Sequence, residues 1–307
     1  MSIVVSSQLP NIEVEASTDV VRRSPHGLGA YLKRNPKLIA GLILIGGLLL
    51  FAVLGAIFVD TDAARPMSAR PSQPPSAEYP FGTDDQGRDL LAVAVVGLPL
   101  TMQVGLIAGV VAIVIGTVLG LIAGYVGGWP DMIIRGLCDI LMTVPGLVVL
   151  ITVASSIQGA ISVQMMALVV ASLAWMWPAR TIRSQVLTLR ERAYVQMAKL
   201  SGMNTMEVIF REIMPNLMPF LAASFVGAVS AAILASIGLE ALGLGPQNEP
   251  TLGMTIYWAI SFNAVIRGMW WWLAMPIGAI VILFIGLFLI IAGLDEIANP
   301  RLRKVTS

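Results

Sequence analysis

Residues 98–125 read LPLTMQVGLIAGVVAIVIGTVLGLIAGY, and none of these side chains carries a charge. A membrane-spanning helix needs roughly 20 consecutive apolar residues, because each adds about 1.5 Å to a path across a hydrocarbon layer about 30 Å thick. Lipid cannot satisfy backbone N–H and C=O groups, so a segment that crosses it must be helical. This stretch alone therefore predicts a transmembrane helix.

The same criterion predicts five further spans on either side of this one. Between Asp139 and Arg180 lie 40 uncharged residues, enough for two helices, and the polar residues 155–159 divide them. The other three spans are single apolar runs at residues 38–59, 217–239 and 270–294. We therefore expect an all-α integral membrane protein with six transmembrane helices.

The overall composition agrees with a chain that faces lipid. Only 12% of the residues are charged and 57% are hydrophobic, whereas soluble domains carry about 25% charged residues. A net charge of +1 provides no basic surface for nucleic acid. With a single cysteine, Cys138, and a single histidine, His26, neither a disulfide framework nor a structural zinc site is expected.

Lysine and arginine residues set the expected orientation. If the N-terminus is cytoplasmic, four of the 19 lysines and arginines fall outside (Arg65, Arg70, Arg88 and Arg267), which leaves 15 inside. This distribution follows the positive-inside rule and places both termini in the cytoplasm. Because a seventh span would reverse the C-terminus, we expect residues 250–266 to lie at the membrane surface or under the mouth of the bundle. The polar first 37 residues do not resemble a cleavable signal peptide.

These spans and loops divide the chain into parts. They are a cytoplasmic tail at 1–37, the first transmembrane helix at 38–59, an extracytoplasmic loop at 60–97, a core domain at 98–300 that holds five transmembrane helices and a cytoplasmic loop at 181–215, and a cytoplasmic tail at 301–307.

The loop at 181–215 is long and rich in charge. Residues 190–201 are expected to form a helix, which Gly202 ends in a left-handed conformation. Asn204 and Glu207 have the spacing of a capping box, so a second short helix should begin there. That helix carries an apolar patch made of Val208, Ile209, Phe210 and Ile213, and Pro215 should end it. A thin loop cannot bury such a patch, so the patch needs a groove on a partner protein or the membrane surface; the residues alone favour neither.

Several charged residues lie in or near the predicted membrane region. Asp131, Arg135 and Asp139 share one helix face, so Arg135 can pair with either acid in a structural ion network, or the group can act as a gate or a proton site. Glu240 is expected near the outer end of the fifth span, either lining the pore or lying at the interface in water. In the outer loop, Asp84, Asp85, Arg88 and Asp89 favour internal ion pairs over a metal site, because an arginine is part of the group.

Three stretches together resemble one known family. Residues 191–202 (ERAYVQMAKLSG) and 213–216 (IMPN) resemble the EAA loop of ABC importer permeases. Residues 81–91 (FGTDDQGRDLL) resemble the FGTDxxGRDxL signature of the second permease of oligopeptide and dipeptide importers. Further similarities lie at residues 123–125, with Asp131, Arg135 and Asp139, and at 242–245 and 299–303, so the resemblance covers roughly residues 30–304.

The resemblance implies a type I ABC importer permease fold and a set of contact residues. The cytoplasmic loop would be a coupling helix that sits in a cleft of an ATP-binding subunit. Its docking residues would be Glu191, Tyr194, Gln196, Ala198, Gly202, Asn204, Glu207, Val208, Ile209, Phe210, Arg211 and Pro215. The loop on the side of the extracytoplasmic binding protein would contribute Gly82, Asp84, Asp85, Arg88 and Asp89, and the pore or gate candidates are Asp139, Ser236 and Glu240.

The resemblance also implies a multi-subunit importer in the bacterial inner membrane. The partners would be a homologous permease, two ATP-binding subunits and a substrate-binding protein. No Gly-x-x-x-x-Gly-Lys-Ser/Thr loop occurs in this sequence, so ATP and Mg²⁺ should be bound by the partner ATPases and this chain should catalyse no reaction. No metal or cofactor site is expected in this chain.

Some residues depart from the family pattern, and other functions stay open. Gln196-Met197-Ala198 replaces the usual Glu-Ala-Ala, and Ser236 stands where many relatives carry an acid. Relatives carry di- and oligopeptides, but also oligosaccharides, opines, glutathione or nickel. The main rival class is an ion-coupled secondary transporter, which would need intramembrane acids and an internal repeat. A structural assembly factor would explain the helices but not the loop at 181–215.

Overall fold

The computed structural model describes residues 35–298 of the 307-residue chain. The similarity at 299–303, the tail at 301–307 and most of the tail at 1–37 lie outside the described residues. In chain order the elements are α2 (Pro36–Phe58), the 3₁₀ turn η1 (Thr61–Ala64), α3 (Leu90–Leu121), the π-helical turn η2 (Ile122–Val126), α4 (Gly128–Thr143), α5 (Gly146–Ser155), α6 (Val163–Ala174), α7 (Met176–Arg190), α8 (Ala193–Leu200), α9 (Thr205–Glu207), the π-helical turn η3 (Val208–Ile213), α10 (Met214–Ala241), α11 (Leu252–Ser261) and α12 (Trp270–Ala298).

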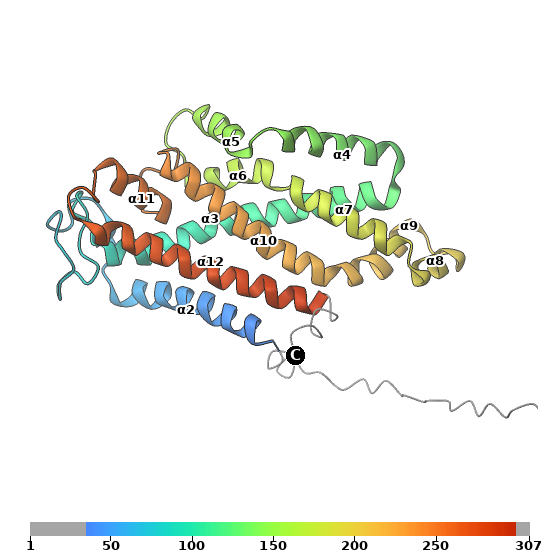
Figure 1. Ribbon diagram of the computed structural model, residues 1–307, viewed down its shortest axis with the longest axis horizontal. Helices are drawn as coiled ribbons and strands as arrows, with labels where there is room; N and C mark the ends of the chain where they lie inside the picture. The colour runs from blue at the N-terminus through green and yellow to red at the C-terminus, as the bar shows by residue number, and fades with distance from the viewer. Residues whose placement is uncertain (1–34, 299–307) are drawn as a thin grey trace, which may run out of the picture.

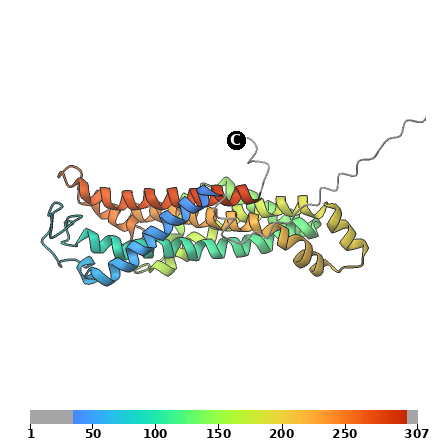
Figure 2. The same ribbon diagram turned by 90° about the horizontal axis from the view of Figure 1, so that it is seen from below.

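The long helices lie side by side and form an elongated bundle (Figures 1 and 2). The loop between α2 and α3 lies with α11 at one end of this bundle, and α8 and α9 lie at the opposite end (Figure 1). The two segments predicted to be outside and inside the cell therefore lie at opposite ends of the molecule.

The number of spans agrees with the predicted six. Four helical stretches are long and apolar enough to cross a membrane on their own: Pro36–Phe58, Leu90–Val126, Thr205–Ala241 and Trp270–Glu296. Two bent pairs supply the other two spans: α4 with α5, bent by 84°, and α6 with α7, bent by 43°. The ten-residue helix α11 is too short to span, which matches the expectation for residues 250–266.

Both bent pairs change direction close to a proline. Val144 is extended and precedes Pro145, which disfavours helical backbone at the residue before it. Pro178 stands in the first turn of α7, where its missing N–H is tolerated. The third span starts at Gly128, well before Asp139, so it includes the charged face of α4 that the charge-free interval had excluded.

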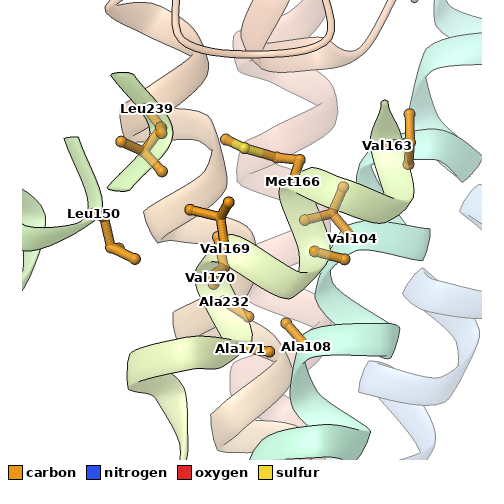
Figure 3. Close-up of a cluster of buried hydrophobic side chains, with 12 residues drawn as sticks. Val104, Ala108, Leu150, Val163, Met166, Val169, Val170, Ala171, Ala232 and Leu239 are labelled. Atoms are coloured by element: carbon orange, nitrogen blue, oxygen red, sulfur yellow. The ribbon is translucent and has the colours of Figure 1, made fainter. Parts of the chain in front are cut away.

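The centre of the bundle is apolar. Figure 3 shows one cluster in which Val104 and Ala108 of α3 meet Leu150 of α5, Met166 of α6 and Ala232 of α10. Glycines let α3 and α10 approach closely: a Cβ on Gly105 or Gly109 would collide with Ile233 or Val229 of α10. Small residues at such contacts are typical of helix pairs in membranes.

Candidate functional site

The loop predicted to be cytoplasmic forms two short helices beyond the end of α7. We call residues 191–213 the docking segment, after their predicted role; it comprises α8, α9 and η3. The predicted single helix over 190–201 is wrong, because Arg192 is extended (φ −71°, ψ 145°) and separates α7 from α8. The break lets α8 fold back toward the bundle, where Val195 is fully buried.

The turn between α8 and α9 contains the predicted left-handed glycine and the predicted capping box. Gly202 adopts φ +85°, its N–H donates to the Lys199 carbonyl at 3.0 Å, and the Met203 N–H donates to the Ala198 carbonyl at 3.2 Å. This is the Schellman pattern that ends many helices. The capping box is also confirmed: the Glu207 N–H donates to Asn204 Oδ1 at 2.9 Å, and the Asn204 N–H donates to Glu207 Oε2 at 3.0 Å.

The apolar patch of the docking segment is mostly covered by this chain itself. Val208 and Ile213 are fully buried and Ile209 nearly so, in one cluster with Ile182 and Val186 of α7. The expectation that the loop cannot bury this patch is therefore wrong, since α7 extends far enough to cover it. Only Phe210 of the predicted patch remains open, with 60% of its surface exposed.

Pro215 does not end this helix. It lies at the start of α10, and helix continues without a break from Thr205 to Ala241. The π-helical turn η3, directly before α10, has the wider i→i+5 hydrogen-bond pattern. The docking segment is therefore joined to α10 by continuous helix.

Four large apolar side chains on the docking segment face outward. We call Met197, Leu200, Met206 and Phe210 the docking surface; their exposed fractions are 63%, 84%, 64% and 60%. The sequence prediction named only Phe210. Helical periodicity could have found two others, because Met197 and Leu200 are three residues apart on α8, as are the buried Val195 and Ala198 on its other face.

Three polar contacts attach the docking segment and the end of α7 to the rest of the bundle. The Arg190 guanidinium donates from Nη1 to the Gly124 carbonyl of η2 at 2.9 Å. The Gln196 amide donates to the Arg190 carbonyl at 3.0 Å. Lys199 Nζ lies 5.1 Å from the ring centroid of Tyr125. Of the other predicted docking residues, Glu191 accepts from Arg190 Nε at 3.0 Å, and Tyr194 and Arg211 are exposed.

The loop at the opposite end is held by internal ion pairs, as predicted. Asp84 Oδ2 accepts from Arg88 Nε at 2.6 Å, and both side chains are buried. Asp85 pairs with Arg267 at 2.6 Å in a more exposed position. Asp89 accepts from the Leu91 N–H and caps α3, and burial raises the pKa of its carboxyl above the usual value.

Two further features fix this outer loop. Gly82 has φ +75°, and a Cβ there would lie 2.7 Å from the Trp271 ring, so this position favours glycine. Trp271 Nε1 also donates to the Thr83 carbonyl at 3.2 Å. Within residues 35–298, no group of three or more His, Cys, Asp or Glu side chains is placed to hold a metal ion.

The charges on α4 pair with α7. Asp131 accepts from Arg183 at both carboxylate oxygens, and Asp139 pairs with Arg180 at 3.3 Å. The predicted pairing of these acids with Arg135 is therefore not what the structure shows. The reason is tertiary, since α7 runs alongside α4 and presents arginines three residues apart.

Glu240 and Ser236 lie together inside the subunit. The Glu240 carboxylate is fully buried and accepts from Ser236 Oγ at 2.8 Å and from Thr251 Oγ1 at 2.5 Å. Thr251 also caps α11 by accepting from the Met254 N–H. Glu240 thus joins α10 to the start of α11 inside the subunit, so the expectation that it could lie at the interface in water is wrong. A pore-lining role for either residue stays a prediction.

Comparisons with known proteins agree with this arrangement. The family model described as "Binding-protein-dependent transport system inner membrane component" matches residues 116–304. The chain is 33% identical over 275 residues to the dipeptide transport system permease protein DppC of Alkalihalophilus pseudofirmus, covering 89% of this chain and 88% of the relative.

Two further relatives show the same extent of similarity. The oligopeptide transport system permease protein OppC of Bacillus subtilis is 30% identical over 272 residues, which cover 89% of this chain and 88% of the relative. The probable D,D-dipeptide transport system permease protein DdpC of Escherichia coli is 31% identical over 271 residues, which cover 88% and 89%. The chain therefore belongs to the family of binding-protein-dependent transport system inner membrane components, and it is a non-catalytic, multi-pass permease subunit of an ABC importer.

Proposed function

We propose that this chain forms half of the translocation pore of an ATP-driven importer for di- and oligopeptides. It pairs with a homologous permease, docks one of two ATP-binding subunits and receives its substrate from an extracytoplasmic binding protein. The observation that carries this proposal is the docking surface, which exposes four large apolar side chains at the end of the bundle opposite the outer loop.

The docking surface has the character of a protein contact. Exposed Met, Leu and Phe side chains on one short segment are unfavourable in water, and such side chains are typical of interface cores. The segment that carries them is fixed by a Schellman turn, a capping box and a buried cluster, so its backbone conformation is set before a partner binds. A preformed surface loses little conformational entropy on binding, which supports docking into a cleft.

A polar route for peptides is best formed between two subunits. Apolar clusters, one of them drawn in Figure 3, pack the described bundle, and the buried polar group of Ser236, Glu240 and Thr251 is occupied by its own hydrogen bonds. Such a packed interior has no lining for a hydrated peptide. A homologous partner placed against this chain would supply the second wall. Of the pore candidates Asp139, Ser236 and Glu240, only Asp139 has an exposed side chain, so Ser236 and Glu240 would reach such a route only if α10 and α11 separate.

The substrate class follows from the relatives. The three relatives named above are described as dipeptide, oligopeptide and D,D-dipeptide permeases. Uptake of radiolabelled dialanine into proteoliposomes that contain the full transporter tests this class. Competition by an oligosaccharide, an opine, glutathione or Ni²⁺, with no effect of excess peptide, would reassign the substrate. Uptake that requires an ion gradient and no ATP would favour a secondary transporter.

The docking role is tested with a matched pair of variants. Phe210→Asp places a charge at the docking surface and should remove the ATPase subunits from a mild-detergent pulldown of the tagged chain. Met67→Asp is the control, because Met67 is 90% exposed in the outer loop at the other end of the bundle. If Phe210→Asp keeps its ATPases and its uptake, the docking assignment is wrong.

A further inference from the structure

The helix α3 ends in an unusual joint. Its last turn is the π-helical turn η2; Gly127 follows with φ +70°, and α4 begins at Gly128 with φ +60°. π-helical turns are rare and are frequently found at functional sites. The two glycines supply left-handed backbone that other residues adopt reluctantly. The α3–α4 joint is therefore a specialised piece of backbone at the end of the bundle that carries the docking segment.

Two cations bind this joint from outside α3. Arg190, the last residue of α7, donates to the Gly124 carbonyl of η2 at 2.9 Å. Lys199, in the last turn of α8, lies 5.1 Å from the ring centroid of Tyr125, within the range of about 6 Å for a cation–π contact. Two residues that are nine positions apart thus hold neighbouring residues of the same five-residue turn.

Arg190 also holds α8, so one residue connects three elements. Its carbonyl accepts from the Gln196 amide at 3.0 Å while its guanidinium binds η2. The fit between α7 and η2 leaves no spare room: a Cβ on Gly124 would lie 2.8 Å from Val186 Cβ and 2.9 Å from the Arg183 carbonyl. Movement of the end of α7 is therefore transmitted directly to η2.

The helix α4 is attached to α7 at the same end of the bundle. Asp131, in the first turn of α4, accepts two hydrogen bonds from Arg183 of α7. Leu121 of α3 also lies in the buried cluster that holds Val195 and Val208 of the docking segment. The contacts of Arg190 and Lys199 add polar anchors at η2, and the Asp131 pair ties α4 to α7.

We propose that Arg190 and Lys199 are positioning residues that fix the docking segment to η2, so that the α3–α4 joint moves with the docking segment as one body. The ATPase would then move the ends of α3 and α4 together with α7 and α10. The inference rests on the proposed function, because a docked ATPase is what displaces the segment. In this proposal Arg190 and Lys199, which are not part of the docking surface, transmit the movement of the docking segment to η2.

The first experiment measures whether the two parts move together. Spin labels are placed at Ser201 of the docking segment and at Trp129 of α4, both exposed, in a Cys138→Ser background of the assembled transporter. The distance between them is measured by pulsed electron resonance without nucleotide and with ATP and vanadate. The proposal expects the same distance in both states for the parent protein, and a shifted or broadened distance with ATP in Arg190→Ala and Tyr125→Leu.

Two control variants separate the contacts from general damage. Tyr125→Phe keeps the aromatic face that Lys199 contacts and should behave as the parent. Arg192→Ala removes an exposed arginine two residues away, for which no side-chain hydrogen bond or ion pair is found in the described part of the chain. A distance that already changes with ATP in the parent protein would overturn the proposal.

The second experiment measures coupling in the same reconstituted transporter. Arg190→Ala and Tyr125→Leu should keep their ATPase subunits and hydrolyse ATP, while dialanine taken up per ATP falls about ten-fold, as for the loss of a coupling contact. If both variants transport as the parent does, or if both lose their ATPases, the transmission role is wrong. Failure of the proposed function looks different, since the parent transporter itself would then lack ATPases or dialanine uptake.

Discussion

Gln196 stands where the resemblance to the EAA loop predicts a glutamate, and its amide makes a contact that a carboxylate cannot make. It donates to the Arg190 carbonyl at 3.0 Å, whereas an ionised carboxylate has only acceptor atoms. In Gln196→Glu the two oxygens would face each other, so α8 should lose an anchor worth about 1 kcal/mol.

Hydrogen exchange of the α8 amides measures this effect directly. The amides of residues 193–200 should exchange faster in Gln196→Glu than in the parent. Gln158→Glu is the control, because Gln158 is exposed in the loop between α5 and α6. Equal exchange of α8 in the parent and in Gln196→Glu would show that the side-chain contact does not hold the helix.

Among the elements, the outer loop offers a comparison of two neighbouring ion pairs. Asp84→Asn leaves Arg88 buried without its carboxylate partner, and breaking a buried pair in this way costs about 3–5 kcal/mol. Asp85→Asn breaks a more exposed pair with Arg267, for which the cost is about 0–1 kcal/mol. Protease cleavage between residues 60 and 89 should therefore speed up strongly in Asp84→Asn and little in Asp85→Asn. Similar cleavage rates in the two variants would contradict this ranking.

The spans could be predicted from the sequence because they depend on local hydropathy. The capping box and the left-handed turn at Gly202 could also be predicted, because they depend on local backbone chemistry. The burial of Val208 and Ile213 could not, since it requires α7 to extend beyond the membrane region and cover them. The partners of Asp131 and Asp139 were missed for the same reason: helix spacing placed Arg135 nearby, whereas packing brought Arg183 and Arg180 closer. Contacts between elements were the part that periodicity did not specify.

At the scale of the whole molecule, the internal connections run from end to end. At one end, Arg190 of α7 and Lys199 of the docking segment contact η2, and at the other, Glu240 and Thr251 tie α10 to α11. The long helices α3 and α10 are packed against each other through glycines between these two ends. Such stiff connections suit a subunit that must convert a movement at one face into an opening at the other.

The helix α2 is attached to this body mainly through α12, and glycines make the contact possible. A Cβ on Gly41 would lie 2.7 Å from the Gly286 carbonyl and 2.8 Å from Ile290 of α12, whereas a Cβ on Gly46 would meet nothing within 4 Å. Gly41→Leu should therefore force α2 away from α12, at a cost of about 1–3 kcal/mol for overpacking. Its thermal midpoint in detergent should fall by roughly 5 °C. Gly46→Leu adds the same side chain on an open face and should melt as the parent does; equal midpoints for both variants would show that close packing does not hold α2 in place.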